Sequence, residues 1–193
     1  MKVENYKPTK SSFLSIEKDM SIIIDSIFSN KTLLKLLYYA SKDALERPAL
    51  TEEQKLEMVD KNIKIRPKVY VDNDVKTYII IRIRDFVPSS NPEYRSCIIE
   101  FDICCHMEQW AMKDFKLRPY RIAAELDSMF TNKHLSGIGT LDFAGTSDLN
   151  LTDEYCGLCL QFLAYHGDED KNNVQPKENP AHVQDFKDII EDY

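Results

Sequence analysis

Cysteines and histidines are the residues of this 193-residue chain whose spacing comes closest to that of a chemical site. Cys104-Cys105-His106 and Cys156-x-x-Cys159 contain residue types that bind zinc, and CxxC is a common half-site. Both groups fall in expected strands, where neighbours one or three positions apart point to opposite faces. We therefore expect buried structural cysteines and no metal or other cofactor. The odd number of cysteines, five, also indicates a reducing compartment rather than a disulfide framework.

Catalysis by a nucleophile would need a histidine base and an orienting group close to it. His106, His134 and His166 each lie near the end of an expected element, and His106 and His166 would be neighbours only if their strands pair. Four carboxylates have the residue type of a metal-dependent nuclease site, but they lie in and around an expected turn: Asp142, Asp148, Asp153 and Glu154. Solvated turn carboxylates explain them better, and we expect no enzyme.

One charged strand face is more informative. In the expected strands, Arg82 and Arg84 share a face, and Glu100 and Asp102 share the outward face of the next strand. Antiparallel neighbours would pair the four as cross-strand ion pairs. Either this face meets solvent, where such pairs contribute little, or it meets another subunit, where charge sets register and partner choice. We take these four residues as candidate interface residues.

Composition limits the class of protein. Apolar residues make up 43%, which is enough for a globular core, and only five glycines argue against a glycine-rich nucleotide cradle. With 25 basic and 32 acidic residues the net charge is -7, so the chain lacks the basic footprint of a protein that grips nucleic acid non-specifically. No apolar run suits a membrane span, and the first residues lack the apolar stretch of a secretory signal. We expect a soluble protein that stays inside the cell that makes it.

Helical periodicity is clear in three places. Residues 13–40 predict two helices with a break at Ser29-Asn30. Thr51 to Gln54 reads as a capping box for a short helix, and Pro119 suits the first turn of another.

Strand alternation predicts a hairpin of residues 64–71 and 76–86 about a turn at 72–74, and then a strand over 95–107. Two further strands, 134–143 and 154–165, would be joined by a turn region at 145–151. The fold class expected is α+β, with N-terminal helices and a mainly antiparallel sheet of about five strands with one central helix, in the order α-βββ-α-ββ.

The domain organisation expected is an N-terminal arm (1–14), a single α+β domain (15–166), a flexible polar linker (167–181) and a short amphipathic docking peptide (182–193). Apolar residues recur in the last segment at helical spacing: Val183, Phe186, Ile189 or Ile190, and Tyr193. A helix this short is marginal alone, so it would gain structure by docking on its own domain, on another subunit or on a partner.

Several local segments resemble proteins of the phage neck: Leu36-Leu37-Tyr38-Tyr39, Pro48-Ala49-Leu50-Thr51, Ile63-Lys64-Ile65-Arg66-Pro67, Asn91-Pro92-Glu93-Tyr94-Arg95, Phe101-Asp102-Ile103, Trp110, Leu117-Arg118-Pro119-Tyr120-Arg121-Ile122 and Gly137-Ile138-Gly139. Together with the element order, they make the chain similar to tail-terminator or head-tail connector proteins of tailed bacteriophages, and to ring proteins of crAss-like phages in particular. The resemblance covers residues 15–166.

The resemblance implies a structural virion protein, made in the host cytoplasm, that forms a ring of six or twelve copies in the neck or tail. Such a ring would join portal to tail and let genomic DNA pass without specific binding, as an acidic lumen would favour. Its partners would be itself, the portal and other neck or tail proteins, with no membrane. Two alternatives stay open: an intracellular interaction module acting through its C-terminal peptide, and a small metal-dependent hydrolase.

Overall fold

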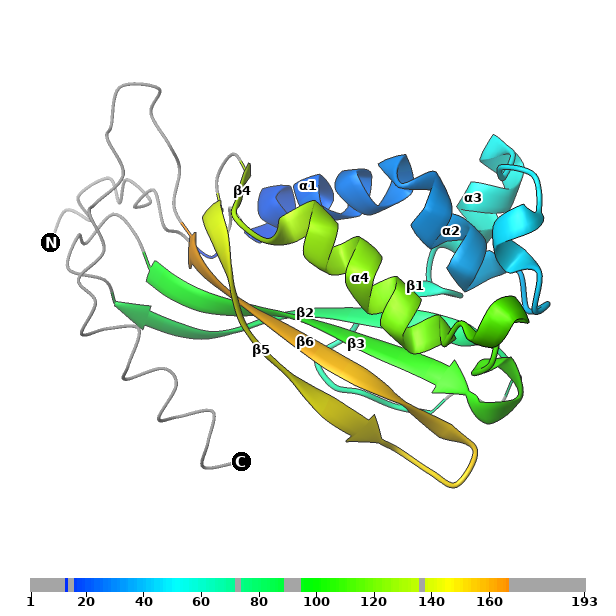
Figure 1. Cartoon of the computed structure of the whole chain (residues 1–193). Coiled ribbons are helices and arrows are strands. Elements are labelled where there is room, and N and C mark those ends of the chain that lie inside the picture. The colour runs from blue at the N-terminus through cyan, green and yellow to red at the C-terminus, as the bar shows by residue number, and fades with distance from the viewer. Residues whose placement is uncertain (1–12, 14–15, 72–73, 89–94, 136–137, 167–193) are drawn as a thin grey trace, which may run out of the picture.

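The computed structural model describes residue 13 and residues 16–71, 74–88, 95–135 and 138–166 (Figure 1). Its elements follow the chain as α1 (Ile16–Ser29), α2 (Lys31–Tyr38), η2 (Ala44–Glu46), α3 (Glu52–Met58), β1 (Ile63–Ile65), β2 (Thr77–Pro88), β3 (Arg95–His106), η3 (Met107–Gln109), η4 (Lys113–Phe115), α4 (Arg118–Phe130), β4 (Lys133–Leu135), β5 (Gly139–Asn150) and β6 (Tyr155–His166). The η elements are single 3-10 turns.

The described residues form two layers. Six strands make one sheet in the order β1-β2-β3-β6-β5-β4, antiparallel at every pair except β1 with β2. Helices α1, α2 and α4 lie on one face of that sheet (Figure 1). The predicted α+β class is therefore confirmed.

Local caps set the helix boundaries. Asn30 ends α1 and caps α2, because its side chain accepts a hydrogen bond from the backbone N–H of Leu33. The same side chain donates to Glu125 of α4 at 2.9 Å, so the predicted break also joins the two helices to α4. The predicted capping box of Thr51 and Gln54 is present at the start of α3.

The main core lies between the helices and the sheet. Cys97, Ile99, Phe101 and Ile103 of β3 alternate into it, as predicted. The Phe101 ring stacks on Phe130 of α4 with centroids 4.9 Å apart and meets the edge of Phe162.

The predicted hairpin of residues 64–71 and 76–86 is wrong. β1 pairs with β2 in parallel, with Ile63 opposite Ile79. Residues 66–71 and 74–76 lie outside the ladder, and Val69 and Tyr70 pack on the opposite face of the sheet against Tyr78. Their apolar spacing reflects this crossing of the sheet face rather than a second hairpin strand.

The predicted turn at 145–151 is also wrong. Residues 145–150 belong to β5, and Leu151 follows directly after it. The chain reverses after Asn150, where Leu151 and Thr152 donate backbone hydrogen bonds to the Tyr155 carbonyl. Gly145 marks a bulge in the β5–β6 register rather than a turn. With the short strand β4, which the sequence pattern merged into its neighbour, the sheet has six strands among the described residues rather than about five.

Of the predicted flanking segments, only Phe13 of the arm is described, and its ring meets that of Phe86 with centroids 5.2 Å apart. The linker (167–181) and the docking peptide (182–193), with Val183, Phe186, Ile189 and Tyr193, lie outside the described residues. The division into these segments stays a prediction. Within the described part of the chain, no helix has the length and apolarity needed to span a membrane.

Candidate functional site

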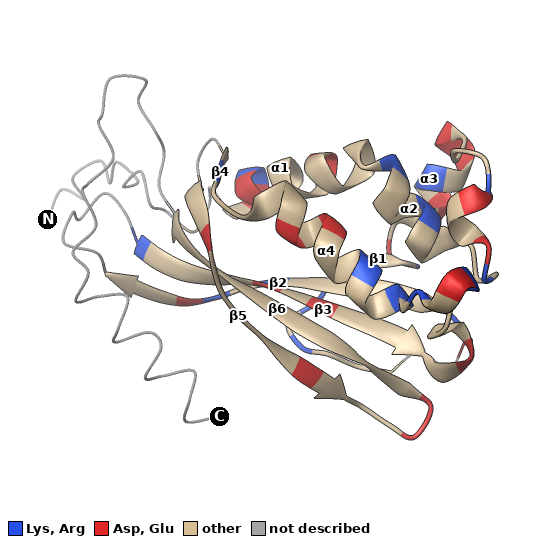
Figure 2. Cartoon of the chain, viewed as in Figure 1, with Lys and Arg blue, Asp and Glu red and all other residues tan. Residues whose placement is uncertain are grey.

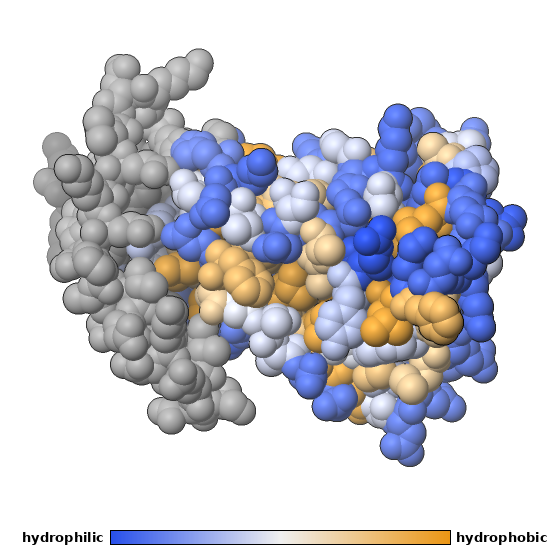
Figure 3. All heavy atoms as spheres, viewed as in Figure 1, coloured by the Kyte–Doolittle hydropathy of each residue, from blue (hydrophilic) through white to orange (hydrophobic). Residues whose placement is uncertain are grey.

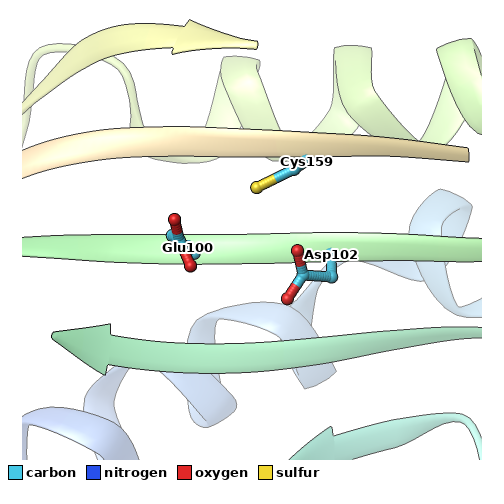
Figure 4. A group of neighbouring side chains, drawn as sticks. All are labelled: Glu100, Asp102 and Cys159. Atoms are coloured by element: carbon cyan, nitrogen blue, oxygen red, sulfur yellow. The ribbon is translucent and has the colours of Figure 1, made fainter. Parts of the chain in front are cut away.

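The sheet face turned away from the helices carries a cluster of charged side chains, which we call the arginine–carboxylate cluster: Arg82, Arg84, Glu100 and Asp102. The antiparallel register of β2 and β3 sets Arg82 opposite Glu100. On the other side of β3, the register sets Asp102 opposite Cys159 and Glu100 opposite Gln161. Figure 4 shows Glu100 and Asp102 on β3 with Cys159 on the neighbouring strand.

Arg82 binds both carboxylates. Its Nε donates to Asp102 Oδ2 at 2.7 Å and its Nη2 to Oδ1 at 3.0 Å, a bidentate pair. The same Nη2 lies 2.8 Å from Glu100 Oε2. The other oxygen of Glu100, Oε1, lies 2.5 Å from Arg84 Nη2 and accepts a hydrogen bond from the Gln161 amide at 2.8 Å.

The predicted cross-strand ion pairs are present, with their carboxylates buried and their arginines partly exposed. Whether this face meets solvent or another subunit stays a prediction. Glu100 is 1% exposed and Asp102 is fully buried, while Arg82 and Arg84 keep 21% and 39% of their side chains exposed. Side-chain alternation predicts which residues share this sheet face and which residues lie opposite each other across β2 and β3. It does not predict what covers the face. Burial raises the pKa of Asp102, and the hydrogen bonds and charge of Arg82 limit the rise.

The cluster has the ligand types of a metal centre but not its electrostatics. One ligand atom each of Glu100, Asp102 and Cys159 lie within 4.8 Å of one another. Both carboxylates already face guanidinium groups, and burial raises the pKa of the Cys159 thiol far above its usual range. A cation would have to displace Arg82 and deprotonate Cys159, so these residues fit a closed ionic cluster better than a metal site.

We expect the Arg82→Met variant to lose about 2–3 kcal/mol of unfolding free energy at pH 7, because both buried carboxylates lose a partner. Without that cation the pKa of Asp102 rises further. A group with a raised folded-state pKa stabilises below its unfolded pKa and loses that stability as pH rises through the folded value. The deficit should therefore shrink as pH falls toward about 4.

Urea unfolding at several pH values measures the difference. Arg47→Met is the matched control, because the ion pair of Arg47 with Asp43 is exposed and its loss should leave the unfolding free energy nearly unchanged. A deficit of Arg82→Met that is equal at pH 4 and pH 7 would contradict the electrostatic account.

Four of the five cysteines are buried, as predicted for structural residues, whereas Cys156 is only half-buried. All five are free, and Cys104 and Cys105 belong to opposite faces of β3. Cys156 and Cys159 lie in β6 without a knuckle turn, so the zinc half-site geometry is absent there. Burial raises the pKa of Cys104 to about 12 and that of Cys105 to about 11, which makes both poor nucleophiles at neutral pH.

At pH 8 we expect a thiol reagent to modify native protein rapidly at Cys156 alone, because the other four cysteines are buried. Cysteine thiols of the unfolded chain ionise near pH 8.5, whereas Cys104 and Cys105 stay protonated in the folded protein because burial raises their pKa. The free energy of unfolding should therefore fall above about pH 9. Peptide mapping after labelling and unfolding curves from pH 8 to 10.5 check both points. Cys156→Ser is the control that should remove the fast reaction, and fast labelling of Cys159 would contradict the structure.

The histidines and turn carboxylates do not assemble. His106 and His166 were expected to be neighbours if their strands pair, and this is wrong: the strands pair antiparallel, with His106 opposite Tyr155 and His166 opposite Arg95 at the two ends of the ladder. His134 lies exposed on β4. Among the acidic residues, Asp142 and Asp148 lie in β5 rather than in a turn, whereas Asp153 and Glu154 lie at the reversal before β6.

Sequence inspection missed Arg118, the largest of the fully buried side chains. Its guanidinium donates to five backbone carbonyls: Gln109 at 2.8 Å, Leu36 at 2.6 Å, Tyr39 at 2.8 Å, Ala40 at 3.1 Å and Ser41 at 2.9 Å. These carbonyls include the negative end of the α2 dipole, which favours a cation. Arg118 thus joins the end of α2 to the start of α4 as a structural clamp.

The comparison with protein families gives one match. The YomW family model covers residues 30–164, which is most of the described domain. The chain belongs to the YomW family. This family name is that of a phage protein group, which supports a phage origin for the chain. No curated protein matches it.

The matched range runs from the Asn30 cap to residue 164 in β6 and contains both the arginine–carboxylate cluster and Arg118. The family match supports the phage part of the resemblance. It leaves the role within the phage to be argued from the structure.

Proposed function

We propose that this YomW-family protein is a non-enzymatic structural component of the virion, forming a ring of six or twelve copies in the neck or tail. Its partners would be further copies of itself, the portal and other neck or tail proteins, and genomic DNA would pass through the lumen. The similarity of the sequence segments to head-tail connector and tail-terminator proteins motivates this role, and the family match supports its phage origin.

The observation that carries the proposal is that the sheet has two open edges on its opposite sides. β1 covers only residues 79–81 of β2, and no described strand pairs with the outer edge of residues 82–88. On the far side, β4 covers only residues 139–141 of β5, and no described strand pairs with the outer edge of residues 142–150. Two different edges on one subunit allow a head-to-tail contact, which closes into a ring when the rotation permits.

The chemistry of the described side chains agrees with a structural role. The titratable groups that lie together are mutually neutralised, and the buried thiols are held protonated. An active site normally keeps a general base or nucleophile poised for its substrate. The net charge of -7 would let DNA slide through a ring without adhering to it.

Two measurements test the proposal. Quantitative mass spectrometry of purified particles should give a constant number near six or twelve copies per particle, and absence from particles would overturn it. Native mass spectrometry of a Ser147→Lys, Asp148→Lys variant should show loss of the ring, because lysines on an edge strand block strand addition. The control Glu53→Lys adds positive charge to an exposed position of α3 and should leave the ring intact.

A further inference from the structure

An exposed aromatic surface lies where η4 meets α4, and we call it the aromatic turn: Phe115, Leu117 and Tyr120. Phe115 is fully exposed, and Leu117 and Tyr120 are 41% and 52% exposed. Figure 3 shows apolar side chains surrounded by hydrophilic ones at the end of the molecule where α4 begins. An apolar surface with a polar rim is typical of a protein contact site.

Backbone strain accompanies the outward position of Phe115. Asp114 and Phe115 both adopt left-handed conformations, with φ of 59° and 57°, which non-glycine residues rarely do. The turn is fixed on both sides, since Met112 donates to the Lys116 carbonyl at 2.8 Å and Lys113 to the Lys42 carbonyl at 3.0 Å. Strain of this kind persists where the surroundings enforce it, and it often accompanies recognition.

Three basic residues lie on or next to the aromatic turn, together with the acidic Asp114 inside η4. Lys113 and Arg121 are exposed, Lys116 is half-buried, and the first turn of α4 has no acidic residue (Figure 2). Lys113 and Lys116 have surface partners in Glu46 and Asp114, at 2.8 and 3.4 Å. Exposed pairs of this kind contribute little, so an acidic ligand can replace them.

The chain itself contains a segment of complementary chemistry, which we call the tail segment: residues 182–193. On a helix its apolar side chains, Val183, Phe186, Ile190 and Tyr193, share one face. Four acidic residues and a single lysine make the rest negative: Asp185, Asp188, Glu191, Asp192 and Lys187. An apolar face bordered by carboxylates matches an aromatic surface bordered by lysine and arginine.

The exit point of β6 favours docking between copies. β6 ends at His166, beside the start of β3, whereas η3 and η4 follow the other end of β3. The two ends of this 12-residue ladder are about 36 Å apart, and the linker of residues 167–181 spans about 21 Å on average. We propose that the tail segment of one copy docks on the aromatic turn of a neighbouring copy. The proposal rests on the proposed function only in requiring that copies meet.

A labelled synthetic peptide of residues 182–193 tests the docking, with full-length Phe186→Asp protein as receptor so that its own tail segment does not compete. We expect saturable binding by fluorescence anisotropy, weakened at least tenfold by Phe115→Ser and about threefold by Lys116→Glu. A peptide with Asp188→Lys should regain affinity for the Lys116→Glu receptor. Leu56→Ser is the control, because Leu56 is 73% exposed on α3, away from the turn.

Mixing two full-length variants, each also carrying Ser147→Lys and Asp148→Lys to block assembly through the sheet edge, tests which copy is used. The Phe115→Ser protein keeps its tail segment, and the Phe186→Asp protein keeps its aromatic turn. If the tail segment docks between copies, sedimentation should show a mixed dimer. If it docks within its own copy, no mixed dimer should form. Absence of saturable binding, equal binding to the Phe115→Ser receptor, or absence of the mixed dimer overturns the inference. A ring counted in particles without peptide binding overturns this inference alone, whereas peptide binding by a protein absent from particles overturns the ring alone.

Discussion

We expect the Gly157→Ala variant to fold poorly or not at all. Gly157 lies in the central strand β6 opposite Cys104, and an added Cβ would lie 1.7 Å from the backbone oxygen of Ile103. The methyl group would meet backbone rather than a side chain that can move, so β3 and β6 must separate locally. A cost of about 3 kcal/mol or more is expected, which is a large share of a domain's stability.

Gly145→Ala is the matched control. Gly145 also lies in a strand, but nothing lies within 4 Å of the position a Cβ would take, so its unfolding free energy should change by about 0.5 kcal/mol or less. Circular dichroism and urea unfolding of the two variants measure the difference. A Gly157→Ala protein as stable as Gly145→Ala would show that β3 and β6 are spaced differently from the structure.

We expect Arg118→Leu to cost about 4 kcal/mol or more, because five buried or partly buried carbonyls lose their donor at once. Arg118→Lys should recover only part of the loss, since an ammonium has three donors and cannot form the planar fork. Burial lowers the pKa of Arg118, but a guanidinium remains charged at neutral pH.

Arg121→Leu is the control for this clamp, because Arg121 lies exposed on the same helix. Denaturant midpoints rank the three variants, and native-state hydrogen exchange should show faster exchange at the end of α2 in Arg118→Lys. Equal midpoints for Arg118→Leu and Arg121→Leu would contradict the role of the clamp.

Sequence patterns predicted what is local. Asn30 and Thr51 act as caps within their own helices, and the alternation along β3 gave its two faces and the partners Arg82 and Glu100. These features depend on neighbours a few residues away or on one adjacent strand, which is the range that periodicity reports.

Features that depend on distant partners were not predictable. The parallel position of β1 depends on Asn62, whose side chain donates to the carbonyls of Leu37 and Thr77. The acceptors of Arg118 include carbonyls 77 to 82 residues away, and a backbone carbonyl leaves no trace in the amino-acid type. The pattern of β5 favours a turn because the strand is polar and contains a glycine. These features suit a strand with a bulge and with an outer edge that no described strand covers beyond residue 141.

The strand order has a consequence for how a newly made chain folds. β6 is the last described strand along the chain, yet it lies between β3 and β5, and it supplies Leu158, Leu160 and Phe162 to the core. On the ribosome, β2 and β3 can pair early, but the sheet cannot close until residue 166 has emerged. Closure of the sheet therefore requires late insertion of a central strand, and a chain terminated before β6 leaves the inner edge of β3 unpaired.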